Sequence, residues 1–551
     1  MTPEVPEEAE VPPEDSTQAF VRNTAVMSVG TALSRVTGFL RLAAMAYALG
    51  ITESRLPDAY NIANVTPNII YELALGGILT SVVVPVFVEW LQLRGREQAW
   101  DVARRLFTFA LVGLSAIAIL GIALAPWIVD LYTSGVPESE RAAVRDLATF
   151  FLRWFMPQIV FYGLGAVATG LLNGHRRFAA PMFAPITNNL IVIGTFAAFA
   201  AMGGPADGSQ QLATSAQRLV LAIGTTLGVV GMTVVLWPSV RATGFRFAWR
   251  WGWRHEAIGR ITRLAAWVVV YVAANQLGLL VVIVIANQVQ GGYTAYASAF
   301  ILFQLPHAIF AVSIFTALLP AMSSRWAERD VEGFRRFLAQ GLRATAAIVL
   351  PASLGYVVLA RPIVRLLLEH GVTGAESGDV VAGVLVFFAI GLVPFSAFQL
   401  LLRAYYSMQD TRTPALVNIG AVALNTVANL VFFFALDLGA RGLALGHAAA
   451  YAAGAAALAL LIRRRLHGIE GARVLSSFGR TMVAGGLTAA SAWLVARLMD
   501  DAFGVETLGR QAAQVSTAVG TGLVVFLIAA TVLRVEEVDM VRRQLVSRWR
   551  R

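Results

Sequence analysis

The sequence predicts an all-α polytopic membrane protein of about 14 transmembrane helices, at about 20 residues for each crossing of the bilayer. Of its 551 residues, 57% are hydrophobic and only 14% are charged, whereas soluble globular chains carry about 25% charged residues. Cysteine is absent and all 43 basic residues are arginine. This composition excludes disulfides, zinc–thiolate sites and the lysine of a P-loop ATPase.

The amino-terminal segment is polar, unlike the rest of the chain. Its first 15 residues hold six carboxylates and four prolines but no arginine. We expect residues 1–19 to form a disordered, acidic cytoplasmic tail. Because this tail lacks the basic start of a cleaved signal peptide, the first apolar run is expected to remain as a membrane span.

Fourteen apolar runs follow, and the arginines between them predict the topology. Loops on one side of the expected membrane carry 29 arginines and loops on the other carry nine. The positive-inside rule therefore places both termini in the cytoplasm. The expected spans are 20–50, 58–91, 106–131, 147–172, 181–203, 215–240, 264–287, 293–322, 340–368, 378–408, 414–437, 441–463, 476–497 and 510–534.

An internal repeat divides the chain. LAPWIVDLY at 124–132 matches LARPIVRLL at 359–367 at an offset of 235, and Pro157 matches Pro394 at an offset of 237. Six spans separate the copies, so the copies have the same orientation. The repeat predicts two parallel six-helix lobes with a substrate path between them. The lobes are expected at 20–240 and 264–465, and residues 466–551 would add two helices and a basic cytoplasmic end.

Residues 241–263, which join the lobes, alternate aromatic residues with arginines, as in Trp249, Arg250 and Trp251. Such a pattern can bind single-stranded nucleic acid. Because the segment lies between two membrane spans, we expect an amphipathic linker at the membrane interface instead. Membrane lipids are therefore the expected partners, and nucleic acid is not.

Four arginines lie within the expected spans, where each costs about 2.5–3.5 kcal/mol to insert. Arg35 and Arg41 lie near the middle and outer half of the first span and are the strongest candidates for a polar cavity. Arg153 starts its span and can snorkel to the interface. Arg403 lies toward the cytoplasmic end of the tenth span, where snorkelling and function are equally favoured.

The second span combines charges with residues that break helices. It begins with Asp58, contains Pro67-Asn68, and places Glu72 between apolar neighbours. Asp58 either marks the outer interface or acts directly. Glu72 either pairs with an arginine of the first span or contacts substrate, because an unpaired carboxylate there would be costly.

Other polar residues suggest structural roles. Asn418, Asn425 and Asn429 share one face of the eleventh span, which is typical of helix–helix contacts, with an ion site as the alternative. The histidines show no metal-ligand spacing. No pairing of a nucleophile with a base is evident, so we expect a transporter and no enzyme.

Several motifs give the chain a family resemblance. They include SRVTGFLR at 34–41, Asp58-Ala59, Pro67-Asn68 and YYSMQDTRTP at 405–414. These residues resemble the MurJ (MviN) family of lipid II flippases, in the superfamily that also holds MATE exporters. The resemblance implies fourteen helices, of which the last two form a groove for the lipid tail. It also implies functional importance for Arg35, Arg41 and Asp58.

The chain departs from the family pattern at several positions. Tyr71 and Glu72 stand where many members have arginines after Pro-Asn, and Ile301 stands where the family has an arginine in the eighth span. The cationic cavity is therefore expected to be thinner here. The sodium site of some members cannot be transferred, because spans seven and eleven hold no acidic residue before Asp437.

The resemblance implies a flippase that moves the undecaprenyl-pyrophosphate-linked peptidoglycan precursor, lipid II, to the outer leaflet of the cytoplasmic membrane by alternating access. We expect no cofactor, and we expect coupling to the membrane potential or to an ion gradient. Cell-wall synthesis and division proteins are the expected protein partners. The residues predicted to bind substrate are Arg35, Arg41, Asp58, Asn68, Glu72 and Arg403.

Other functions are less compatible with the sequence. Within the transporter class, the alternatives are a flippase for another polyprenyl-linked glycan and a MATE-like ion-coupled exporter, which would favour carboxylates in its cavity. A lipid-linked glycosyltransferase needs an acidic cluster, usually in a sizeable loop, and the outer loops here are short and hold none. A membrane scaffold would leave the buried arginines unexplained.

Overall fold

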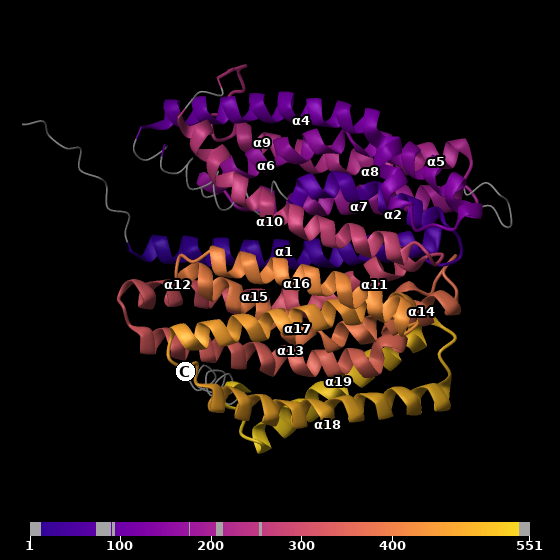
Figure 1. Cartoon of the computed structure of the whole chain (residues 1–551), viewed down its shortest axis with the longest axis vertical. Coiled ribbons are helices and arrows are strands. Elements are labelled where there is room, and N and C mark those ends of the chain that lie inside the picture. The colour runs from indigo at the N-terminus through magenta and orange to yellow at the C-terminus, as the bar shows by residue number, and fades with distance from the viewer. Residues whose placement is uncertain are drawn as a thin grey trace, which may run out of the picture.

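A computed structural model describes the backbone of residues 13–72, 90, 94–175, 177–204, 213–252 and 256–538. The described part is built from helices, as the sequence predicts. In Figure 1 the helices run nearly side by side in two groups, with α18 and α19 along the far edge of the second group.

The first group of helices corresponds to the first expected lobe. The first helix begins at Pro13, inside the segment 1–19 that we expected to be disordered. Proline suits the first turn of a helix and acidic residues favour its amino end, so Pro13, Glu14 and Asp15 are compatible with helix. The helices are α1 (Pro13–Leu49), α2 (Leu56–Tyr71), α4 (Arg96–Tyr132), α5 (Glu138–Phe155), α6 (Gln158–Gly174), α7 (Ala179–Ala201), α8 (Ser215–Val234) and α9 (Trp237–Arg241).

The second group continues from α10, and its last two helices pack against α13. The π-helical turns η2 and η3 interrupt two of its spans. The elements are α10 (Glu256–Ala286), α11 (Gly292–Pro306), η2 (His307–Ala311), α12 (Val312–Ala327), α13 (Val331–Leu368), α14 (Ala375–Ile390), α15 (Leu392–Ser407), α16 (Arg412–Leu430), η3 (Val431–Ala435), α17 (Gly439–Arg465), α18 (Gly471–Phe503) and α19 (Leu508–Val532).

The two groups use the same helix pairing. The contacts α1–α7, α2–α5, α4–α6 and α7–α8 of the first group correspond to α10–α16, α11–α14, α13–α15 and α16–α17 of the second. A helix is also broken at the matching place in each group, between α5 and α6 beside Pro157 and between α14 and α15 close before Pro394. The internal repeat in the sequence therefore corresponds to a repeat of helix packing.

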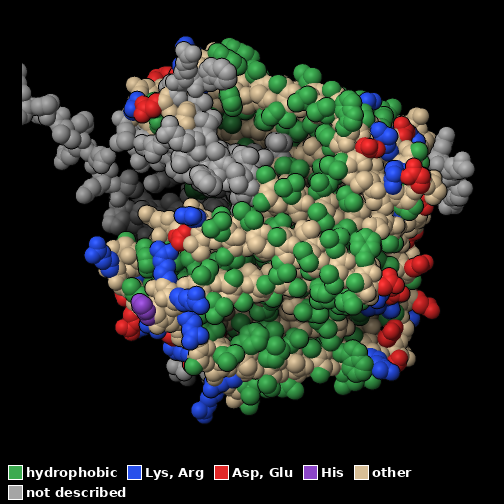
Figure 2. All heavy atoms as spheres, viewed as in Figure 1, with side chains coloured by type: hydrophobic (Ala, Val, Ile, Leu, Met, Phe, Trp, Pro, Cys, Tyr) green, Lys and Arg blue, Asp and Glu red, His purple; other side chains and the backbone are tan. Residues whose placement is uncertain are grey.

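The surface has the pattern of a protein that crosses a membrane. Figure 2 shows apolar side chains over the middle of the visible face and charged side chains at the two ends of the helices. Ten described helices are long and apolar enough to span a bilayer, or eleven if the bent pair α14 and α15 counts as one span. The expected first, second and seventh spans, α1, α2 and α10, fall outside that set, so the count of fourteen stays a prediction.

The segment that joins the two groups lies on α4. In its irregular part, the carbonyl of Trp251 accepts a hydrogen bond from Arg105 Nη1 at 3.1 Å. The Trp251 side chain is 55% exposed, which suits an aromatic residue at a membrane interface. The helix α10 begins at Glu256, inside the linker that we expected at 241–263.

Candidate functional site

A cavity of about 580 Å³ lies among α1, α2, α6, α7, α8 and α11. Two of its lining residues, Arg35 and Arg41, come from α1, one turn before and one turn after Gly38. Of the described residues that line this cavity, these two carry a charge. Arg35 is exposed in the isolated chain and Arg41 is half-buried. A cavity with two guanidinium groups and no described carboxylate attracts an anion.

A second cavity of about 210 Å³ adjoins the first, because both are lined by Gly38, Arg41, Tyr162 and Ile301. We call it the amide chamber, because five side-chain amides line it. Arg41 is the charged group among its described lining residues. The five amides belong to Asn61, Asn64, Asn68, Gln158 and Asn188.

Two tyrosines connect the cavities. The rings of Tyr71 and Tyr162 lie 4.8 Å apart between centroids. The Tyr162 hydroxyl donates to Asn68 Oδ1 at 3.3 Å. Tyr71 lines the larger cavity, and Ile301 lines both. Tyr71 and Ile301, the positions at which the resemblance led us to expect a thinner cationic cavity, add no charge to this wall.

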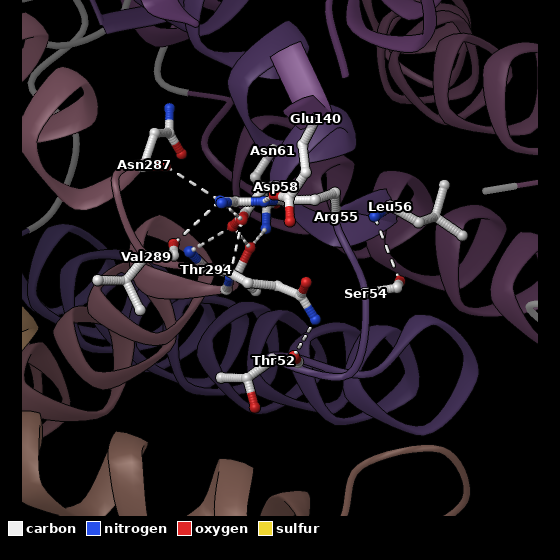
Figure 3. Close-up of polar contacts among 12 residues, drawn as sticks. Thr52, Ser54, Arg55, Leu56, Asp58, Asn61, Glu140, Asn287, Val289 and Thr294 are labelled. Carbon is white, nitrogen blue, oxygen red and sulfur yellow. Dashed lines mark hydrogen bonds and ion pairs between the residues drawn. The ribbon is translucent and has the colours of Figure 1, made fainter. Parts of the chain in front are cut away.

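Asp58 of α2 ties the two groups of helices together at the end that bears the loop 50–55. Its side chain is 1% exposed. It accepts hydrogen bonds from the backbone N–H of Gly291 at 2.8 Å, and from the backbone N–H and hydroxyl of Thr294 at 3.2 and 2.7 Å, as Figure 3 shows for Thr294. Both donors belong to the second group, so the carboxylate lies at the boundary between the groups, and it lines neither of the two cavities.

Arg55 extends this contact. Its side chain is 5% exposed, its Nη1 lies 3.5 Å from Asp58 Oδ2, and its Nε donates to Glu140 at 2.6 Å. The same Nη1 donates to the carbonyls of Asn287 and Val289, both at 3.0 Å (Figure 3). One guanidinium group thus links α2 and α5 to the turn between α10 and α11.

Glu53 makes a second bridge at the same end. Its carboxylate accepts from the backbone N–H of Gly374 at 2.7 Å and from the Ser377 hydroxyl at 2.6 Å. The Thr52 and Ser377 hydroxyls lie 2.5 Å apart. Burial raises the pKa of Glu53, but hydrogen bonds from Ser377, Gly374 and Ile51 outweigh it and leave the pKa below its usual value. We call the contacts of residues 52–58 with 287–294 and 374–377 the closed end.

Two other residues that we predicted to bind substrate, Glu72 and Arg403, lie apart from Arg35 and Arg41. Glu72 accepts a hydrogen bond from Gln276 Nε2 at 2.9 Å, and it forms no ion pair with a described arginine in this conformation. It faces α10 at the end of α2, whereas the arginines face α6, α7 and α11. The Arg403 guanidinium lies 5.2 Å from the centre of the Phe315 ring and lines neither cavity. The substrate-binding roles of all six residues stay predictions.

Asn418 and Asn429 of the eleventh span contact neighbouring helices, whereas the hydrogen bond of Asn425 stays within α16. Asn418 Nδ2 donates to Asn275 Oδ1 of α10 at 3.5 Å. Asn429 Nδ2 donates to Asn425 Oδ1 at 3.1 Å, and Gly446 of α17 packs against Asn429. Among the described residues, no group of three or more His, Cys, Asp or Glu side chains could hold a metal ion.

Sequence reasoning missed several residues of these sites. Asn61 and Asn64 precede the predicted Asn68 by seven and four residues, which places all three on one helix face, and that signal was available. Arg55 precedes Asp58 by three residues, the spacing of an ion pair on a helix. Gln158 directly follows the proline at which the fourth span breaks.

Comparison with known proteins gives the family. The model of the family "Lipid II flippase MurJ" matches residues 45–513. The lipid II flippase MurJ of Burkholderia cenocepacia is 28% identical over 408 residues, which cover 73% of this chain and 76% of the relative. The probable lipid II flippase MurJ of a Synechocystis strain is 24% identical over 551 residues, covering 97% and 99%.

Solved structures show the same fold. A lipid II flippase MurJ in an inward closed conformation superposes with a TM-score of 0.73 at 20% identity, covering 92% of this chain and 98% of the other. An inward-facing MATE multidrug transporter gives a TM-score of 0.64 at 16% identity, covering 79% and 96%. Because the family model matches most of the sequence, the chain belongs to the lipid II flippase MurJ family.

Proposed function

We propose that this protein carries lipid II, an undecaprenyl-pyrophosphate-linked disaccharide-peptide, from the inner to the outer leaflet of the cytoplasmic membrane. The observation that carries the proposal is the larger cavity with Arg35 and Arg41. Arginine stays charged at any relevant pH and can bind phosphate oxygens through two N–H groups at once. A pyrophosphate is therefore a suitable ligand, while the lipid tail remains in the bilayer.

The closed end supports an alternating-access mechanism. Rocking of two repeated helix bundles can expose a site between them to each side in turn. The contacts of Asp58, Arg55 and Glu53 hold the bundles together at one end of the helices. Opening toward that end requires these contacts to break, and the arginine cavity would then face the other leaflet.

The orientation proposed from the arginine count places the closed end outside the cell and both termini in the cytoplasm. In this orientation the cavity is loaded from the cytoplasm and released outside. No ATP site is evident in the sequence, so the membrane potential, which is worth about 2.3 kcal/mol per charge per 100 mV, or an ion gradient would drive the cycle. Cell-wall synthesis and division proteins are the proposed protein partners.

The MATE-like alternative is less compatible with the site. An exporter of organic cations needs carboxylates where its substrate binds. The described residues that line the two cavities include none, and two arginines are present instead. A flippase for another polyprenyl-pyrophosphate glycan fits the arginines equally well, so the experiment must compare head groups.

The test uses the full chain in lipid vesicles with fluorescent lipid II and measures how much lipid becomes accessible from the opposite leaflet. We expect translocation by the native protein and less than a tenth of it by the Arg35→Ala, Arg41→Ala double variant. Arg153→Ala is the matched control, because Arg153 is another arginine within a span but lines neither cavity. A second polyprenyl-pyrophosphate glycan is run in parallel.

Two outcomes would contradict the proposal. Equal translocation by the native protein and the double variant would show that the arginine cavity does not carry the lipid. Faster transport of the second glycan than of lipid II would reassign the substrate.

A further inference from the structure

The amide chamber contains buried polar atoms that the protein does not pair. Gln158 is fully buried, and its Nε2 donates to Thr226 at 3.2 Å, but its Oε1 has no hydrogen-bond partner among the described residues. Ser298 is 1% exposed, and its hydroxyl has no described partner either. Both residues line the chamber. Buried polar atoms are nearly always paired, so these two atoms are available to a ligand.

The two atoms offer complementary chemistry, one from each helix group. Gln158 Oε1 can only accept a hydrogen bond, and the Ser298 hydroxyl can donate one. Gln158 lies at the start of α6 in the first helix group, and Ser298 lies on α11 in the second. An amide carries one N–H donor and one C=O acceptor, so a single amide group could use both.

The position and the volume of the amide chamber restrict which part of a ligand it can hold. Arg41 lines both cavities, so a group in the amide chamber is adjacent to the place proposed for the pyrophosphate. The chamber, at about 210 Å³, is smaller than the roughly 300–1,000 Å³ of sites that enclose whole drug-sized ligands. It therefore suits one building block of the head group. Its described lining is rich in amides and hydroxyls and has no carboxylate, which suits a block that both donates and accepts hydrogen bonds and disfavours a cation.

We propose that the amide chamber is a subsite for the 2-acetamido group of the sugar attached to the pyrophosphate. The acetamido N–H donates to Gln158 Oε1, and its carbonyl accepts from the Ser298 hydroxyl. Other chamber amides, such as Asn64, face the hydroxyl groups of the same sugar. This inference rests on the proposed function and adds what the site recognises beyond the anion.

The test measures binding of three soluble probes to the full chain in detergent. They are farnesyl diphosphate, farnesyl-diphosphate-linked glucose, and the same compound with N-acetylglucosamine, which differs only in the acetamido group. We expect the acetamido probe to bind about tenfold more tightly than the glucose probe, because a site with buried polar groups discriminates against a ligand that leaves them unpaired.

Two variants remove the proposed contacts separately. Gln158→Leu and Ser298→Ala should each reduce the preference for the acetamido probe to about twofold or less, and should leave affinity for the glucose probe nearly unchanged. Gln514→Leu is the matched control, because Gln514 is 2% exposed, has an unpaired Oε1 among described residues, and lies outside both cavities. It should keep the full preference. The melting temperature of each variant identifies misfolding, and the Ser298 change is the milder of the two.

Failure of the subsite and failure of the proposed function give different results. Tight binding of all three diphosphates without preference, lost in Arg41→Ala, would overturn the subsite and leave the anion site in place. No binding of any diphosphate would overturn both. A preference that survives in both cavity variants would show that the acetamido group is recognised elsewhere, and it would refute this assignment.

Discussion

The closed end should depend on the charge of Asp58. In Asp58→Asn, Oδ1 can still accept from Thr294, but an NH₂ group replaces Oδ2, to which the Gly291 N–H donates at 2.8 Å. Two donors then face each other in a buried place. Arg55, which is 5% exposed, also loses its carboxylate partner on α2, 3.5 Å away, and keeps Glu140 at 2.6 Å.

The cost follows from these lost contacts. A hydrogen bond to a charged group contributes about 1.5–3 kcal/mol, and a buried donor left unpaired costs about 1–3 kcal/mol. Because the structure can relax partly, we expect a total of about 3 kcal/mol against the closed state. At about 1.4 kcal/mol for each factor of ten, the ratio of closed to open molecules should fall by roughly 100-fold.

The chain has no cysteine, so two introduced cysteines can carry spin labels without background. Ser139→Cys in α5 and Ala375→Cys in α14 place one label on each helix group at the closed end, and both positions are exposed. Electron–electron distance measurements on the labelled parent should show a population of molecules with a short distance between the labels. In Asp58→Asn most molecules should have a longer distance between the labels.

A matched control separates this effect from general loss of charge. Asp130 also lies near this end, is 53% exposed and pairs with Arg145 at 3.3 Å within the first helix group. Asp130→Asn should leave the distances unchanged. If Asp58→Asn has the parent's distance distribution while the melting temperature shows a folded protein, the carboxylate does not hold the two groups together.

Three further predictions follow from the charges. Arg35→Lys or Arg41→Lys should recover only part of the translocation that alanine removes, because lysine cannot bind two phosphate oxygens in one plane. Full recovery by lysine would show that a positive charge at the position is sufficient. The lowered pKa of Glu53 means that the closed state gains stability above the usual value near 4.5 and loses it as the pH at the closed end falls through the lowered value. Spin-label distances should therefore lengthen on acidification, and Glu53→Gln should lose that dependence. Arg343→Leu should destabilise the protein by about 3–5 kcal/mol, which a lower melting temperature would show. Arg343 is 6% exposed, and its loss removes an ion-pair partner, 3.3 Å away, from the buried Glu537.

Hydropathy and charge patterns predicted the helices well, because a bilayer requires long apolar helices whatever their packing. Every expected span has a helical counterpart in the described residues. Only ten of these helices, or eleven with the bent pair, are long and apolar enough to span a bilayer. The repeat, inferred from short matches such as that of Pro157 with Pro394, corresponds to repeated helix pairing. The beginning of α1 at Pro13 was missed, because composition alone made its first two turns look like part of the tail.

The site was predicted less well, because contacts between distant segments leave no mark in a local pattern. Arg41 and Asn68 line the cavities, and their roles in binding substrate stay predictions, whereas Asp58 contacts Thr294, a residue 236 positions away. The partner of Glu72 was expected to be an arginine, because those were the nearest cations along the chain. In this conformation a neutral residue of α10, Gln276, fills that place.

The two sites are joined by a short chain of hydrogen bonds, which suggests how substrate and closed end communicate. Asn61 lines the amide chamber, and its Nδ2 donates to Thr294 Oγ1 at 3.2 Å, while the same hydroxyl donates to Asp58 Oδ1 at 2.7 Å (Figure 3). A sugar that draws Asn61 toward itself would weaken the orientation of the Thr294 hydroxyl, and so weaken one of the contacts that hold the two helix groups together. A ligand shifts a conformational equilibrium only through contacts that differ between the states, and Asn61 lies where such a difference can arise. Binding in the chamber would then lower the cost of opening at the closed end, so that the loaded protein opens more readily than the empty one.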